Sequence, residues 1–120
     1  MSTSDLTSIS AVALATHDMA TSVSFYGALG FELTYGGVEA AFSSLRFGQC
    51  FVNLALREIE TPVPWWGRVI FHVPNVDAVY HKAMASGFDV EAPPRDASWG
   101  ERFFHVTDPA GHQLSFAKPL

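Results

Sequence analysis

The chain has 120 residues, of which 48% are hydrophobic and 16% are charged, and its formal net charge is −5. This composition predicts one globular domain with a packed core and excludes a disordered or fibrous chain. The seven Lys and Arg residues are spread along an acidic sequence, which argues against nucleic-acid binding and favours neutral or cationic small ligands.

The first half of the chain predicts a strand, a helix and three further strands. Residues 9–16 alternate in hydropathy, and one face of this strand carries only Ile9 and alanine methyl groups. Asp18 is placed to cap a helix that Gly30 ends. Three further strands are predicted at 31–35, 40–47 and 49–56. Cys50 lies in the strand at 49–56 and is expected to be a buried structural thiol rather than a nucleophile.

The second half repeats this order after a linker, residues 58–65, that contains proline and tryptophan. A strand is predicted at 69–73, and a helix runs from its cap at Asn75 to Gly87. Asn75 follows Asp18 by 57 residues, and Gly87 follows Gly30 by the same number. Because the helix caps and the helix-ending glycines share the same offset, we predict one structural unit that occurs twice, at about 8–57 and 66–120.

The chain closes with a predicted hairpin. Trp99 lies in a turn before a strand, and Asp108-Pro109-Ala110-Gly111 forms a tight turn before a last apolar strand. Proline presets the first turn dihedral, and glycine supplies any positive φ. No apolar run approaches the ~20 residues that span a bilayer, and the start lacks a signal-peptide pattern. A cytoplasmic protein without a membrane partner is therefore expected.

These C-terminal motifs carry a family resemblance. The segment Trp99-Gly100-Glu101-Arg102-Phe103, followed by Asp-Pro-x-Gly and an apolar strand, resembles the signature of the vicinal oxygen chelate superfamily. This superfamily comprises glyoxalases, bleomycin resistance proteins and extradiol dioxygenases, and the segment is most similar to the bleomycin resistance group. The resemblance implies an α+β fold of two paired βαβββ modules, with curved mixed sheets around a cavity and helices outside. It also implies a homodimer with sites between subunits.

The resemblance further locates the metal-ligand positions of the metal-dependent members. They fall at Ala11, Arg68 and Ser115, and at either Val52 or Asn53 in the fourth strand. Divalent ions need oxygen and imidazole donors from several strands, whereas a guanidinium would place a positive charge where the ion belongs. The five histidines form no close-spaced pair. We therefore expect no metal, no other cofactor and no catalytic residue.

The candidate ligand contacts begin with three indoles on loops. Trp65 ends the linker and Trp66 directly follows it, and both either pack at a seam or contact a ligand. Trp99 matches an aromatic residue that stacks on drug in the bleomycin resistance group, so the resemblance favours ligand contact.

Further candidates come from the predicted strands. Arg68 and His72 share strand parity and are expected to face the cavity, although a carboxylate could instead cap Arg68. Glu101 could transfer a proton beside His105, or be solvated or paired with Arg102. The remaining candidates are aromatic residues that form either cavity walls or core, namely Tyr35, Phe42, Phe51 and Phe104.

These features favour a metal-independent protein that sequesters an aromatic or peptide antibiotic at a homodimer cleft. The alternative is a metal-dependent lyase, isomerase or dioxygenase of the same superfamily. A third possibility is a small regulatory partner whose cavity is filled by its own side chains.

Overall fold

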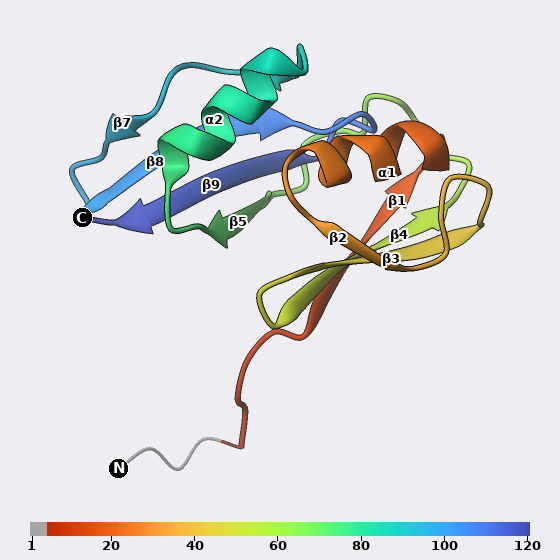
Figure 1. Cartoon of the computed structure of the whole chain (residues 1–120). Coiled ribbons are helices and arrows are strands. Elements are labelled where there is room, and N and C mark those ends of the chain that lie inside the picture. Colours follow the sequence, from red (N-terminus) through yellow and green to blue (C-terminus); the bar gives the residue numbers. More distant parts are fainter. Residues whose placement is uncertain (1–4) are drawn as a thin grey trace.

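The computed structural model describes residues 5–120 and contains two mixed β-sheets, each with one helix across one face (Figure 1). The first half supplies β1 (Ala11–Thr16), α1 (Met19–Ala28), β2 (Glu32–Tyr35), β3 (Phe42–Phe47) and β4 (Cys50–Leu56). The second half supplies β5 (Arg68–His72), α2 (Val76–Ala85), β6 (Asp89–Val90), β7 (Arg95–Asp96), β8 (Glu101–Thr107) and β9 (Gln113–Pro119). The expected α+β class, with paired βαβββ modules, is confirmed.

The two sheets share one topology. The strand order is β1-β4-β3-β2 in the first sheet and β5-β9-β8-β6 in the second. In each sheet the first strand of the module pairs in parallel with the last, and the other pairs are antiparallel. The two-residue β7, which pairs with β8, was not predicted because it is too short to show alternation. β1 and β5 are therefore edge strands.

Equivalent caps begin the two helices. Asp18 has φ −142° and ψ 96°, and its side chain accepts a hydrogen bond from the Thr21 amide. Asn75 has φ −143° and ψ 97° and accepts in the same way from the Ala78 amide. Both side chains satisfy an amide that has no partner within the helix. Both predicted caps are confirmed.

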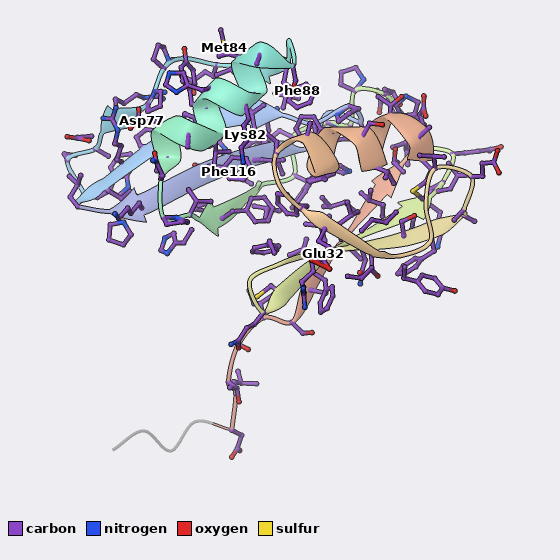
Figure 2. The ribbon with its side chains drawn as sticks, in the orientation of Figure 1. Glu32, Asp77, Lys82, Met84, Phe88 and Phe116 are labelled. Atoms are coloured by element: carbon purple, nitrogen blue, oxygen red, sulfur yellow. The ribbon has the colours of Figure 1, made fainter. Side chains whose placement is uncertain are left out.

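An aromatic core joins the two modules between their helices and sheets. Phe25 of α1 lies 4.5 Å from Phe88, and Phe31 lies 5.3 Å from Phe71 of β5, both measured between ring centroids. Phe71 stacks on Phe116 of β9 at 5.2 Å, and Figure 2 labels Phe88 and Phe116 beside α2. The helix-facing sides of both sheets thus share one apolar interior.

The Asp-Pro-Ala-Gly turn also connects the modules. The buried carboxyl group of Asp108 accepts hydrogen bonds from the amides of Ala110 and His112 and from the hydroxyl of Tyr26 in α1. Burial first, and then Asp108, raise the pKa of Tyr26 well above its ordinary value, so this hydroxyl stays protonated. The predicted turn is present and anchors α1. Within residues 5–120, no helix is both long and apolar enough to span a bilayer.

Candidate ligand-binding cleft

Each sheet turns one face toward its helix and the other face away. In β1 the buried Leu14 and Thr16 lie on the helix side, so the alanine methyl groups lie on the opposite, open side. Strand register places Phe51 beside Ala11 and Asn53 beside Ala13 on this open face. The predicted face of methyl groups thus lies on the open side of the first sheet.

The open face of the second sheet is richer in polar groups. Register aligns Arg68, Ile70 and His72 of β5 with alternate residues of β9, whose intervening Leu114 and Phe116 are buried in the core. Across β9, Ser115 lies beside His105 of β8. This face therefore presents a guanidinium, imidazoles, a hydroxyl group and aromatic rings.

A pocket of about 720 Å³ lies between the edge strands β1 and β5. This volume is in the range of sites for drug-sized ligands, roughly 300–1,000 Å³. We call this pocket the cleft. It contains four predicted ligand contacts, namely Phe51, Trp66, Arg68 and His72, together with Ala11. Ile70, which shares the strand parity of Arg68 and was expected to face the cavity with it, also lines the cleft. Ile9, Cys50 and Glu101 line it as well and were not predicted as contacts.

Cys50 and Ile9, two of the lining residues, contact each other at the edge of the first sheet. Cys50 is half-buried rather than buried, and its thiol hydrogen-bonds the carbonyl oxygen of Ile9. Ile9 lies just before β1 and shares the parity of Ala11, so the alternation at 9–16 could have placed it in the cleft.

Trp66 is oriented by a hydrogen bond to His112. Its indole N–H donates to Nδ1 of the imidazole at 2.8 Å, while Nε2 lies 2.8 Å from the carbonyl oxygen of Ala15. Because an indole only donates, Nδ1 carries no proton, and Nε2–H donates to Ala15. His112 thus connects Trp66, which directly follows the linker, with the last turn and β1.

Arg68 lies over an aromatic ring rather than against a carboxylate. Its guanidinium carbon is 5.2 Å from the ring centroid of Trp65, an arrangement typical of a cation–π contact. Within residues 5–120 no acidic group lies within ion-pair distance of Arg68. The carboxylate cap considered from sequence is therefore absent from this part of the chain.

Glu101 connects the cleft to the exposed Trp99. Its carboxylate accepts a hydrogen bond from Trp99 Nε1 at 3.0 Å, and its other oxygen is 3.8 Å from His72 Nε2. Trp99 is 69% exposed and lies tilted against Phe103, with ring centroids 5.5 Å apart. Trp99 thus lies at the rim of the cleft, and the pairing of Glu101 with His72 was not predicted.

Among the alternatives left open for Glu101, pairing with Arg102 is not found in residues 5–120. Arg102 instead forms ion pairs with Asp77, at the start of α2 (Figure 2), and with Asp96. The hydrogen bonds from Arg102 lower the pKa of Asp77. The hydrogen bonds to Asp77 and then to Asp96 raise the pKa of Arg102. Arg102 has opposite strand parity to Glu101, so it lies on the helix side of β8.

His105 lies on the open face between polar and aromatic neighbours. Its ring centroid is 4.9 Å from that of Phe103, and its Nδ1 is buried without a hydrogen-bond partner in residues 5–120. Burial first, and then the positive charge of Arg68, lower the pKa of His105 below its ordinary value of 6.5. The imidazole is consequently neutral at neutral pH.

Three predicted wall residues lie outside the cleft. Tyr35 and Phe42 are exposed on the first sheet, with ring centroids 6.3 Å apart. Of the two alternatives left open for Phe104, the ring is core and not cavity wall, because it is fully buried on the helix side against Tyr80 and Phe116.

Comparison with known proteins identifies the family. Residues 8–116 match the family model of the Glyoxalase/Bleomycin resistance protein/Dioxygenase superfamily. The chain belongs to this superfamily. The match spans both modules and confirms the resemblance found in the C-terminal motifs.

Several solved structures share the fold of this chain. TioX from Micromonospora sp. ML1 is 27% identical, with a TM-score of 0.78 over 95% of this chain and 100% of that one. The bleomycin resistance determinant encoded on transposon Tn5 is 19% identical, with a TM-score of 0.78 over 94% and 98%. Lactoylglutathione lyase from Agrobacterium tumefaciens is 18% identical, with a TM-score of 0.76 over 96% of both chains. The last two likenesses concern the fold alone.

A match to a curated sequence is shorter. The uncharacterized Mycobacterium bovis protein Mb0911c is 38% identical over 48 residues, which are 40% of this chain and 32% of that protein. The match thus spans about a third of the mycobacterial protein.

The metal positions of the glyoxalase superfamily can now be compared with this structure. Register resolves the fourth-strand position, because Val52 is fully buried whereas Asn53 lies on the open face and accepts a hydrogen bond from Ser44. Within residues 5–120, no three His, Cys, Asp or Glu side chains are arranged to hold a metal ion. A methyl, an amide, a guanidinium and a hydroxyl group do not fit a divalent cation.

Proposed function

We propose that this protein binds a small, planar and partly apolar molecule in the cleft, and sequesters it without a metal. An aromatic or peptide antibiotic is the ligand class that this site favours. The observation that carries the proposal is the cleft itself, about 720 Å³ in volume, walled by Ile9, Phe51, Ile70 and the indole of Trp66. Such walls stabilise a flat apolar ligand by removing its surface from water.

Orientation of the indoles supports stacking as the mechanism. Trp66 is held by His112, and Trp99 at the rim is held by Glu101. A side chain that is ordered before binding loses less conformational entropy when the ligand arrives. Each aromatic ring stacked on an indole gains about 1 kcal/mol beyond burial of its area.

The proposal includes a homodimer that closes the cleft. Tyr35, Phe42, Ile70 and Trp99 are exposed by 66%, 41%, 57% and 69%. Large apolar side chains exposed together on a soluble domain are typical of an interaction surface. β1 and β5 are edge strands beside the cleft, and natural proteins cover such edges. A second copy facing these edges would enclose a bound ligand. Sedimentation equilibrium measures the oligomeric state, and a monomer at high micromolar concentration contradicts this part of the proposal.

Tryptophan fluorescence tests ligand binding directly. Bleomycin-like and quinoxaline-like compounds are titrated into the wild-type protein and into the Trp66→Phe variant. Saturable quenching that weakens in the variant supports binding in the cleft. No quenching of the wild type at micromolar concentrations by any of these compounds removes antibiotic binding from the proposal.

Metal analysis separates this proposal from the enzymatic alternative. Purified protein is assayed for zinc, nickel, manganese and iron, and ligand binding is repeated after chelation. A stoichiometric metal, with function lost on chelation, would favour a lyase, isomerase or dioxygenase of the superfamily instead.

A further inference from the structure

We propose that the ligand of the cleft carries an oxyanion, such as a carboxylate or sulfonate, on its planar body, and that Arg68 binds this group. The inference rests on the proposed function, because it requires that the cleft binds a small molecule. It narrows the ligand from planar molecules in general to planar aromatic anions.

The first support is that Arg68 lines the cleft with its charge unpaired. Arg46, Arg95 and Arg102 each have a carboxylate oxygen within 3.1 Å, whereas Arg68 has none in residues 5–120. A guanidinium is charged at any physiological pH and presents N–H donors in a fork that matches two oxygens of one anion. An unpaired guanidinium at an apolar wall is therefore suited to a ligand oxyanion.

The second support is that Trp65 holds the guanidinium from one side. The guanidinium carbon lies 5.2 Å from the ring centroid, and a cation–π contact does not itself occupy an N–H donor. A guanidinium held beside an indole is partly ordered before an anion binds. Trp65, which sequence reasoning left between packing and ligand contact, then acts as a positioning residue for Arg68.

The third support is the separation of charges along β5. Arg68 begins this strand and His72 ends it, with Ile70 between them on the same face. At about 3.3 Å per residue, the two ends lie roughly 13 Å apart. Glu101, the carboxylate that lines the cleft, lies near His72 and accepts a hydrogen bond from Trp99. An anion at Arg68 is therefore remote from Glu101, and the apolar body of the ligand fits between the two ends.

The surrounding charges agree with this assignment. The lowered pKa of His105 leaves that imidazole neutral, so Arg68 supplies the positive charge at its end of the cleft. The net charge of −5 opposes an anion at long range. This effect is screened over about 8–10 Å at physiological salt, whereas contact with a guanidinium is not.

The test uses two fluorescent probes that share a ring system. Anilinonaphthalene sulfonate carries a sulfonate, and N-phenylnaphthylamine is its neutral counterpart. Both are titrated into the wild type, Arg68→Gln, Arg68→Lys and the control Arg57→Gln. Arg57 donates to the Leu56 carbonyl oxygen and does not line the cleft. Thermal unfolding of each variant verifies that it is folded.

We expect Arg68→Gln to weaken binding of the sulfonate about ten-fold, because a charge-assisted hydrogen bond is lost. Arg68→Lys should lie between the wild type and Arg68→Gln. Binding of the neutral probe should change little in any variant, and Arg57→Gln should affect neither probe.

Three results overturn the inference, and they can be told apart. If the neutral probe binds the wild type but the sulfonate binds Arg68→Gln as tightly as the wild type, the anion site is wrong and the proposed function stands. If neither probe binds the wild type, both proposals fail. An equal loss of both probes in Arg68→Gln also overturns the inference, because it indicates damage to the cleft rather than loss of an anion contact.

Discussion

The indole N–H of Trp66 donates to Nδ1 of His112 across 2.8 Å, and this bond joins the start of the second module to the last turn of the chain. The same imidazole reaches the Ala15 carbonyl oxygen in β1. One buried histidine therefore connects both modules at the wall of the cleft. Because both ring nitrogens are engaged, only one neutral tautomer satisfies the arrangement.

Trp66→Phe should lower the free energy of unfolding by about 1 kcal/mol, since it removes the indole donor and leaves His112 Nδ1 without its partner. Trp65→Phe is the matched control, because Trp65 contacts Arg68 through its ring and a phenyl ring can replace that contact. Urea unfolding of both variants measures the difference. Equal destabilisation would show that the Trp66–His112 bond contributes nothing specific.

Tyr26→Phe should destabilise the protein by about 1.5–3 kcal/mol. The substitution removes a 2.7 Å hydrogen bond and leaves a buried oxygen of Asp108 with one partner fewer. Tyr80→Phe provides the control, because Tyr80 is half-buried and forms ring contacts with His81 and Phe104. Denaturant titration should leave Tyr80→Phe close to the wild type. A Tyr26→Phe variant as stable as the wild type would contradict the anchoring role of Asp108.

Gly111→Ala tests the close approach between the last turn and the linker. Gly111 has φ +101°, and a Cβ there would lie 2.7 Å from the Val63 amide nitrogen and from Pro62 Cβ. Gly48→Ala is the control, because Gly48 has φ +53° and no atom within 4 Å of its Cβ position. The control should lose about 1–2 kcal/mol from backbone strain, and Gly111→Ala about 1–3 kcal/mol more from the clash. Equal losses in thermal unfolding would mean that the linker moves away at no cost.

The fold was accessible from sequence because its signals are local. Asp18 and Asn75 cap their helices through side-chain contacts within three residues, and the spacing of these caps revealed the duplication. Arg68 and His72 were placed in the cleft by alternation along a single strand. Both inferences need only the geometry of one element.

Other features depend on partners that a single sequence does not specify. Phe103 and Phe104 are adjacent, equally apolar and both buried, yet only Phe104 packs in the aromatic core on the helix side. The polar Glu101 and His105 share the parity of Phe103, and this signal could have placed Phe104 inward. The bonds of His112 to Trp66 and Ala15 span 46 and 97 residues. No local pattern predicts such contacts.

The titration of His105 predicts a pH dependence of stability. Burial and then Arg68 lower its pKa in the folded state, so just below pH 6.5 the unfolded chain binds the proton more readily. The contribution of His105 is complete above about pH 6.5 and is lost as the pH falls through the folded pKa. His105→Gln should lack this component, so its stability relative to the wild type should improve as the pH falls from 7 to 5. A constant difference between the two proteins would contradict this account.

Variants that retain one indole distinguish which tryptophan contacts the ligand. The protein has three tryptophans, so replacing two of them with phenylalanine leaves one reporter. Trp66 lines the cleft, whereas Trp99 lies at its rim and is 69% exposed. A planar ligand in the cleft should quench the Trp66 variant most strongly, because quenching requires close contact with the ring. The Trp99 variant should respond only where the ligand, or a second copy of the chain, covers the rim. Quenching confined to Trp99 would move the binding site from the cleft to the outer part of the second sheet.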